Sequence, residues 1–357
     1  MDAKNLQNLP LKIELETKLV LKKLNAAHKA LAELKGLITS IPNQNILIET
    51  LALREAKESS AIENIISTMD ELYQNSALNN YFSSANAKEI YNYATALKRG
   101  FVLVKEKGLL TNNTILEIQK TLEENNAGFR KLPGTKLLND KTGEVVYTPP
   151  QDYDAIVGLM QNLENYINDD SIEDIDPIIK MAIIHHQFES IHPFYDGNGR
   201  AGRIINILYL VQKNLLNLPI LYLSNYIIKN KTEYYKLLQE VRTTNNWQEW
   251  ILYMIAGVED TALKSITLIS GIKVLMQEYK QKIRTELHKI YSQDLINNLF
   301  KYPYTKIEFI EKDLQVSRRT AIRYLEQLSK IGIVEKRKIG RNNFYINQAL
   351  YGLLSAV

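Results

Sequence analysis

The sequence of 357 residues contains no cysteine. This absence excludes a disulfide framework and a thiolate metal site, and it is typical of a protein from a reducing compartment. No apolar run is long enough to cross a membrane, and the N-terminal residues lack the uninterrupted apolar core of a signal peptide. We therefore expect a cytoplasmic protein that has no membrane partner.

Glycine and proline are also scarce, at 15 and 9 residues, and apolar residues recur with helical spacing through most of the chain. Val20, Leu24, Ala27, Leu31 and Leu34, for example, follow one another at alternating steps of four and three. The same pattern predicts a mainly α-helical protein. The other expected helices cover 45–59, 60–73, a stretch from residue 87, 152–168, 175–191, 200–213 and further segments to about 285.

Residues 127–150 break this helical pattern. Two short runs rich in β-formers, 136–138 and 145–147, flank a turn at Asn139 to Gly143. An isolated two-stranded hairpin is barely stable by itself. We therefore expect this hairpin to pack over another part of the protein.

The most informative segment is His192-Pro193-Phe194-Tyr195-Asp196-Gly197-Asn198-Gly199-Arg200-Ala201-Gly202-Arg203, which lies between two apolar helices. Its Gly-Asn-Gly turn opens the second helix, where free backbone N–H groups and the helix dipole favour phosphate. Arg200 and Arg203 add charged donors. Asp196 offers the hard carboxylate oxygen that Mg²⁺ prefers beside phosphates.

His192 completes this set as a base whose pKa lies near neutral pH. The combination suits the attack of a hydroxyl group on a nucleotide phosphate. The alternative is a tight turn between helices that contains these residues without a catalytic role.

These residues resemble the Fic family signature HPFx(D/E)GNGRxxR at every specified position, and the likeness covers about residues 50–260. It implies a Fic-type helical bundle with a β-hairpin flap at about 135–148, which aligns a target segment. It also implies a protein adenylyltransferase that uses ATP and Mg²⁺ to attach AMP to tyrosine, threonine or serine hydroxyls, its own included.

The resemblance assigns roles to the matching residues. His192 would take the proton of the target hydroxyl, Asp196 would hold Mg²⁺, and Phe194 would anchor the loop in the core. Contacts to ATP would come from Gly197, Asn198, Gly199, Arg200, Ala201, Gly202 and Arg203.

Tyr234 and Tyr235 match a tyrosine pair that family members often place near the nucleotide base. Ordinary helix packing is the alternative for each ring. Arg242 stands where some relatives have a nucleotide-contacting asparagine, which leaves the base pocket open.

Three further polar residues precede the central motif. His185 and His186 are adjacent on a helix and point about 100° apart, so they do not readily form a metal site with His192. We expect one of the two in the core and the other more exposed. Glu189 is interpreted as structural.

Upstream, Ser59 to Asn64 match the family's inhibitory pattern (S/T)xxxE(G/N). By this resemblance Glu63 would pair with Arg203 and so occupy part of the ATP site. Ser59 would cap or orient the helix, and removal of AMP from targets would be a second activity. The alternative is an ordinary exposed helical glutamate.

The C-terminal residues change in character. Between Lys301 and Asn347 there are eleven Lys or Arg against five Asp or Glu. The pattern of three helices and a hairpin resembles a winged helix-turn-helix domain, with strands at 333–336 and 343–346. Its candidate recognition helix presents Arg318, Arg319 and Arg323 for DNA, and the alternative is a module for protein contact.

The sequence thus predicts an N-terminal helical region over 1–84, a catalytic domain over 85–285 and a winged-helix domain over 290–357. The leading function is AMP transfer to proteins under self-inhibition, and the family implies a homodimer. The alternative is a DNA-binding regulator whose Fic core senses a nucleotide.

Overall fold

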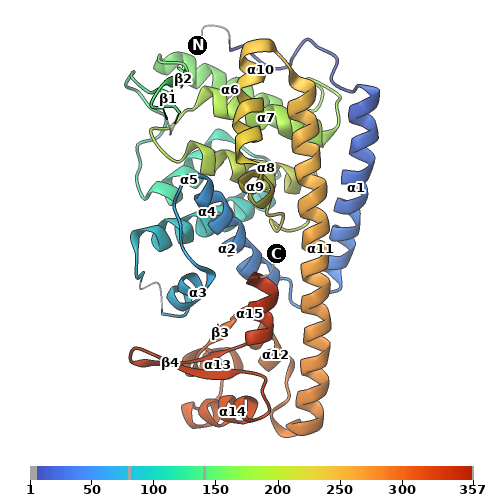
Figure 1. The fold of residues 1–357 in the computed structure, drawn as a ribbon, viewed down its shortest axis with the longest axis vertical. Coiled ribbons are helices and arrows are strands. Elements are labelled where there is room, and N and C mark those ends of the chain that lie inside the picture. The colour runs from blue at the N-terminus through green and yellow to red at the C-terminus, as the bar shows by residue number, and fades with distance from the viewer. Residues whose placement is uncertain (1–5, 79–81, 140–141, 356–357) are drawn as a thin grey trace.

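The structure is a computed structural model that describes residues 6–78, 82–139 and 142–355. Most of the chain forms a tall helical body, and a smaller unit with a sheet lies at one end of it (Figure 1). The predicted class, a mainly α fold with one hairpin in the helical body, is confirmed. The elements are α1 (Lys18–Thr39), α2 (Asn45–Ile62), α3 (Met69–Ala77), α4 (Ala85–Lys107), α5 (Asn112–Glu123), β1 (Leu137–Leu138), β2 (Val145–Tyr147), α6 (Tyr153–Asn168), α7 (Pro177–Ile191), α8 (Asn198–Gln212), α9 (Ser224–Lys229), α10 (Lys231–Thr244), α11 (Trp247–Glu286), a 3₁₀ turn (His288–Ile290), α12 (Gln293–Lys301), β3 (Tyr304–Thr305), α13 (Ile307–Leu314), α14 (Arg318–Lys330), β4 (Glu335–Ile339), β5 (Asn342–Ile346) and α15 (Gln348–Ser355).

Helix α7 lies at the centre of the body, and its side chains are buried from Ile178 to Ile191. Asp176 begins it by accepting a hydrogen bond from the backbone N–H of Ile178, and Pro177 occupies the first turn, where its missing N–H has no cost. The chain then turns through 192–197 into α8, which packs against α7. The central motif therefore joins two core helices, so its backbone has little freedom to move.

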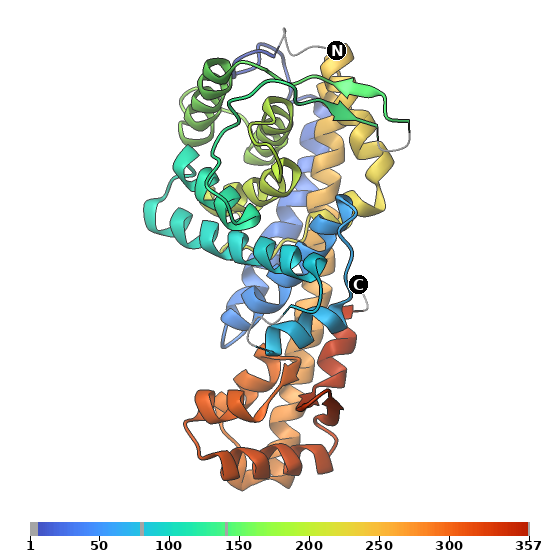
Figure 2. The ribbon, with the colours of Figure 1, turned by 90° about the vertical axis from the view of Figure 1, so that its left-hand side faces the viewer.

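The N-terminal helices are packed into the same body. Helix α1 lies along α11, and α2 packs against α4 and α9 (Figure 1). Helix α11 has 40 residues and extends from the body into the smaller unit (Figure 2). The division of the chain at residue 84 stays a prediction.

Helix α2 differs from the expectation that one helix ends at Ser59 and another begins at Ser60. It continues to Ile62, with Ser59 and Ser60 both buried. The chain turns away from the helix at Asn64, whose φ of 63° is left-handed. The N–H of Asn64 donates to the Ala61 carbonyl at 3.1 Å and the N–H of Ile65 to the Ser60 carbonyl at 3.0 Å, the two bonds of a Schellman motif. Tertiary packing of the serines outweighs their weak helix propensity.

The predicted hairpin is present. Strands β1 and β2 are antiparallel, with Leu137 opposite Tyr147 and Leu138 opposite Val145. Residues 140 and 141 of the expected turn lie outside the described residues. The hairpin packs over the end of α7, where the Tyr147 hydroxyl donates to the Ser190 carbonyl at 3.0 Å.

The smaller unit contains α12, α13, α14 and the β4–β5 hairpin, in the predicted order. Ser317 caps α14 as expected, because its side chain accepts from the N–H of Thr320. Strand β4 begins at Glu335, two residues later than predicted. Strand β3 pairs with β5 to give the order β3-β5-β4, and its two residues are too short a run to be found by alternation.

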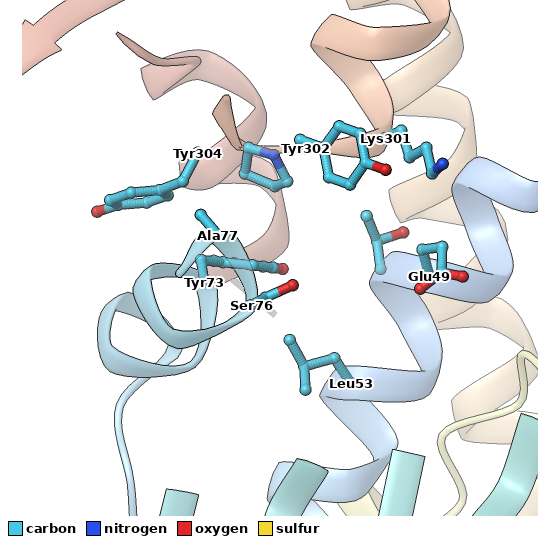
Figure 3. A pocket seen from close by; sticks show the side chains of 10 residues that line it. Glu49, Leu53, Tyr73, Ser76, Ala77, Lys301, Tyr302 and Tyr304 are labelled. Atoms are coloured by element: carbon cyan, nitrogen blue, oxygen red, sulfur yellow. The ribbon is translucent and has the colours of Figure 1, made fainter. Parts of the chain in front are cut away.

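This unit contacts the helices that precede the central motif. The Tyr73 ring of α3 stacks on Tyr304 of β3 with centroids 6.2 Å apart, and Lys306 Nζ donates to the Ala77 carbonyl at 2.9 Å. Side chains of α2, α3 and residues 301–304 line a small pocket of about 30 Å³ between them (Figure 3). Helix α2 therefore contacts the C-terminal unit through Glu49, Thr50 and Leu53.

Within the part of the chain that the structure describes, every helix is too short or too polar to cross a membrane.

Prediction for the end of α2. Asn64→Val should lower the free energy of unfolding by about 1–2 kcal/mol relative to Asn64→Gly, because a side chain with a branched Cβ is strained in the left-handed region while glycine is not. Both variants lose the exposed Asn64 amide, so the comparison isolates the backbone. Urea unfolding followed by circular dichroism measures the difference, and equal stabilities would contradict the left-handed end of α2.

Candidate active site

A cleft of about 1140 Å³ opens above the central motif. Its walls come from the segment after α2, from hairpin strand β1 and from α10, and its floor is the loop between α7 and α8. The structure therefore brings together four regions that are far apart in the sequence. Among the lining residues are Glu63, Asn64, Leu138, Glu189, His192, Asp196, Gly197, Asn198, Gly199, Arg200, Arg203, Lys231, Tyr234, Tyr235 and Arg242.

His192 lies at the end of α7 in a left-handed conformation, with φ 49° and ψ 59°. Non-glycine residues in this region are strained and cluster at functional sites. Burial, followed by the nearby charges of Arg242 and Arg130, lowers the pKa of His192 to about 4. The backbone carbonyl of Glu189 and the charge of Glu63 partly oppose this effect, because both raise the pKa of His192. At neutral pH the ring is therefore uncharged and able to accept a proton.

Asn198 closes the loop between the two helices. Its side-chain oxygen accepts from the N–H of Phe194, and its amide nitrogen donates to the Phe194 carbonyl, both at 2.9 Å. Phe194 itself is fully buried against Phe129 and Phe188. Asn198 therefore fixes the shape of the loop as well as beginning α8.

Gly197 and Gly199 allow close approach at the start of α8. Gly197 has a φ of 77°, and a Cβ on Gly199 would collide with the carboxylate of Glu63. The Glu63 carboxylate thus lies against the first turn of α8, where backbone N–H groups point out of the helix. Ala201 is buried one residue further on, and its N–H already donates to the Gly197 carbonyl. A Cβ on Gly202 would meet Glu189 on α7, so this glycine serves helix packing.

Arg203 is only 1% exposed and is held by the end of α2. Its Nε donates to Ser59 Oγ at 2.7 Å, and its Nη2 donates to the Ser59 carbonyl at 3.0 Å and to Glu63 Oε1 at 2.9 Å. Ser59 lies in the last turn of α2, so it does not cap the start of a helix. Its hydroxyl binds Arg203 instead, because a buried guanidinium requires acceptors on every side.

Each member of the Glu63–Arg203 pair stabilises the charge of the other. Burial works against the charged form of Glu63, but Arg203, together with Arg200 and Lys231, holds the pKa of Glu63 below its usual range. Burial likewise disfavours charged Arg203, but Glu63, together with Tyr234 and Tyr93, raises the pKa of Arg203. Lys231 adds to this arrangement, since its Nζ donates to the Ile62 carbonyl at 2.6 Å at the end of α2.

Arg200 is buried among carboxylates. Its Nη1 donates to Glu89 Oε2 at 3.1 Å and its Nη2 to Glu123 Oε1 at 2.9 Å, while Asp196 lies 3.7 Å away. Burial raises the pKa of Glu123, with Asp196 adding to the rise. Arg200 thus connects the loop to α4 and α5.

Asp196 differs from the buried Arg200 and Arg203 because its side chain is 79% exposed. Its carboxylate accepts from the N–H of Gly197 at 2.7 Å and lies on the floor of the cleft. Mg²⁺ in nucleotide sites keeps several waters and uses one or two carboxylates beside the phosphates. One open carboxylate next to an anion-binding turn fits such an ion.

The two tyrosines of α10 have different surroundings. Tyr234 is 1% exposed and its hydroxyl lies 2.7 Å from His185 Nε2, whereas Tyr235 is 45% exposed in the cleft. His185 and His186 are both buried, so the expectation that one of them is more exposed is wrong. Helix α7 is enclosed on all sides, and the two imidazoles face Trp250 and Trp247 of α11.

Three residues have contacts in the structure that the sequence did not indicate. Arg130 bonds the end of α7, Arg242 lies beside His192, and Glu189 is buried with Oε1 unpaired among the described residues. Burial raises the pKa of Glu189 to about 7. The only sequence feature that could have indicated Arg130 is its position just before the hairpin. A single arginine at such a position does not predict a function, because its contacts are not visible in the sequence.

Sequence comparisons match these parts of the chain. Residues 21–102 match the profile described as Fic/DOC family N-terminal, and 109–210 that described as Fic/DOC family. Residues 275–350 match the C-terminal domain of SoFic-like protein adenylyltransferases. A probable protein adenylyltransferase of Aquifex aeolicus is 32% identical over 161 residues, which are 45% of this chain and 44% of that protein. Protein adenylyltransferase fic-1 of Caenorhabditis elegans is 30% identical over 25% of this chain and 16% of that protein. The matches thus span less than half the length of these relatives.

Solved structures share the fold. A Fic family protein from Desulfovibrio desulfuricans G20 superposes with a TM-score of 0.59 over 95% of this chain and 98% of that one, at 17% identity. Residues 134–508 of Caenorhabditis elegans Fic-1 give a TM-score of 0.56 over 71% of this chain and 73% of that one, at 20% identity. Fic profiles that cover the N-terminal helices, the central motif and the C-terminal unit in order leave one conclusion: the chain belongs to the Fic/DOC family.

Proposed function

We propose that this protein transfers AMP from ATP to hydroxyl groups of proteins, its own included, and that Glu63 restrains the activity. One observation carries the proposal. A neutral histidine, an anion-binding helix start and a buried arginine line the same cleft, and the arginine is already bound to a carboxylate. The adenylyltransferase relatives support the same reaction class.

In the proposed reaction His192 takes the proton of the target hydroxyl. The hydroxyl oxygen bonds to the α-phosphorus of ATP, the bond from that phosphorus to the bridging oxygen of the β-phosphate breaks, and pyrophosphate leaves. The N–H groups at the start of α8 and the Arg203 guanidinium would hold the phosphates. Tyr235, exposed in the cleft, would contact the base, while Tyr234 would support it from the core.

Asp196 would hold Mg²⁺, which neutralises phosphate charge when it is bound. Arg200 would hold phosphate only after exchanging its carboxylate partners, so its first role would be to fix the loop. The hairpin would align the target segment by strand addition. A homodimer stays a prediction.

Inhibition follows from competition for the same groups. The Glu63 carboxylate occupies Arg203 and lies against Gly199, where the terminal phosphate of ATP would bind. A nucleotide can bind productively only when Glu63 withdraws. The Schellman end of α2 and the Lys231 bond hold Glu63 in this position.

Prediction for the base. His192→Ala should reduce AMP transfer to background while ATP binding stays within about threefold, because the proton acceptor is lost and the phosphate site remains. Incorporation of α-labelled ATP measures transfer, and calorimetry measures binding. Transfer at near-normal rate would contradict the role of His192.

Prediction for the inhibitor. Glu63→Gly should raise AMP transfer at least about tenfold, since a change of about 1.4 kcal/mol in the competition already gives this factor. Arg203→Ala should not activate, because it removes the phosphate ligand together with the partner of Glu63. The readout is labelled AMP in target and enzyme, and a rate for Glu63→Gly no higher than wild type at any ATP or Mg²⁺ concentration would contradict inhibition.

DNA binding is a second candidate function, favoured by the surface of the C-terminal unit. Arg319 and Arg323 are exposed on α14, and Lys336, Arg337 and Lys338 are exposed on β4. Two cations of this face form ion pairs. Arg318 Nη1 donates to Glu308 and Glu311 at 3.2 and 3.1 Å, and Arg337 Nη2 donates to Glu335 at 3.3 Å. Among the described residues, the unpaired positive charge of this face therefore lies on Arg319, Arg323, Lys336 and Lys338.

Prediction for DNA. Replacing Arg319 and Arg323 with Ala should weaken retention of duplex DNA and reduce the slope of log affinity against log salt by about two, because two phosphate contacts are lost. Arg318→Ala should have the smaller effect. A gel shift at low salt measures retention, and no binding by the intact protein would favour a protein-contact module.

A further inference from the structure

We propose that Arg130 and Arg242 are positioning residues that fasten the hairpin to the end of α7 and so set the place and charge state of His192. The activity part of this inference rests on the proposed function. The structural part stands on the contacts of the two arginines alone.

The first argument concerns the backbone at the end of α7. The last carbonyls of a helix have no partner inside it and must find one elsewhere. Here five successive carbonyls each accept a hydrogen bond from outside the helix. The donors are Arg242 Nη2 to Glu189 at 3.3 Å, Tyr147 Oη to Ser190 at 3.0 Å, Arg130 Nη2 to Ile191 at 3.5 Å, Arg130 Nε to His192 at 2.9 Å and the Arg130 N–H to Pro193 at 2.8 Å.

The second argument concerns the hairpin. The Arg242 guanidinium lies 4.1 Å from the centre of the Tyr147 ring on β2, and its Nε donates to Ser190 Oγ at 3.1 Å. Arg130 Nη2 also donates to the Pro150 carbonyl, just beyond β2. Each arginine thus holds the end of α7 on one side and the end of the hairpin on the other. A movement of the hairpin would disturb the backbone that carries His192.

The third argument concerns charge. Buried charges are usually paired, yet neither arginine forms an ion pair within 4 Å among the described residues, although Arg130 is fully buried. Their partners include carbonyls at the negative end of the α7 dipole, which favours cations. The site therefore keeps two unneutralised positive charges next to the imidazole.

Those charges act on His192 together with its other neighbours. After burial, Arg242 and Arg130 are the next causes of its low pKa, while Glu63 opposes them. Burial raises the pKa of Glu189 on α7 to about 7 and also raises the pKa of Tyr147 on the hairpin, so below pH 7 neither group supplies a full negative charge. Loss of one arginine should raise the pKa of His192 and leave more of it protonated in mild acid.

The experiment compares Arg242→Gln and Arg242→Lys in the 357-residue chain that carries Glu63→Gly. Arg284→Gln is the matched control, because Arg284 lies over the Tyr291 ring at 4.4 Å far from the cleft. Arg242→Gln should lower kcat at pH 7 by roughly tenfold or more through misplacement of the base. It should change KM for ATP by less than about twofold. In the plot of kcat against pH, the fall in activity on the acid side should occur about 1 pH unit higher. Arg242→Lys keeps the positive charge, so its activity should fall on the acid side at nearly the same pH as that of the parent protein. Arg284→Gln should match the parent in kcat, KM and pH dependence.

Two measurements do not need activity. Titration of the His192 ring by NMR, assigned among the five histidines with His192→Gln, should give a higher pKa in Arg242→Gln than in the parent. Backbone amide exchange of residues 145–148 should become faster. Circular dichroism first establishes that each variant is folded. If Arg242→Gln does not fold, Tyr147→Phe tests the attachment of the hairpin, because it keeps the ring but loses the hydrogen bond to the Ser190 carbonyl.

The outcomes are distinct. A raised His192 pKa with faster hairpin exchange supports the inference, even if the parent transfers no AMP and the proposed function fails. An unchanged His192 pKa, or unchanged exchange of the hairpin in Arg242→Gln, overturns it. A large rise in KM for ATP at constant kcat also overturns it, because Arg242 would then be a nucleotide ligand.

Discussion

The structure around the cleft depends on one buried positive charge, that of Arg203. A guanidinium removed from water needs anionic or polar acceptors on all its donors, and leaving it unpaired would cost several kcal/mol. Ser59 and Glu63 meet this need here, which ties the end of α2 to the start of α8. In the proposed reaction phosphate would have to replace Glu63. Inhibition and catalysis would therefore require the same arginine and exclude one another.

Helix α2 connects this charge to the rest of the molecule. Near its middle, Glu55 is buried and bonded to Ser224 and Tyr93, and burial raises the pKa of this carboxyl to about 7. Nearer its start, Glu49, Thr50 and Leu53 face residues 301–304 of the C-terminal unit (Figure 3). One continuous helix thus contacts the C-terminal unit, the core and the cleft, so its position relative to Arg203 is set by all three.

The loop at the floor of the cleft joins helix ends of opposite polarity. The negative end of α7 faces two arginines, and the positive end of α8 faces the Glu63 carboxylate. His192 lies between them in a left-handed conformation that the bonded carbonyls on either side maintain. The electrostatic order of the site therefore comes from backbone dipoles as much as from side-chain charges, and it keeps the histidine neutral at the pH where it would act.

The sequence alone determined the helical class, the hairpin and the central motif, because each depends on local patterns: apolar periodicity, turn residues, and chemically distinctive side chains within twelve positions. It also indicated Glu63, through a short motif that ends in an asparagine suited to a left-handed helix end. Only the tertiary structure decided the continuation of α2 through Ser59, the burial of both His185 and His186, and the carboxylate partners of Arg200. The contacts of Arg130 and Arg242 with the end of α7 were likewise decided only there. These features depend on contacts between residues that are distant in the chain. Sequence periodicity predicts which face of a helix is apolar, but it does not show which distant side chains meet there.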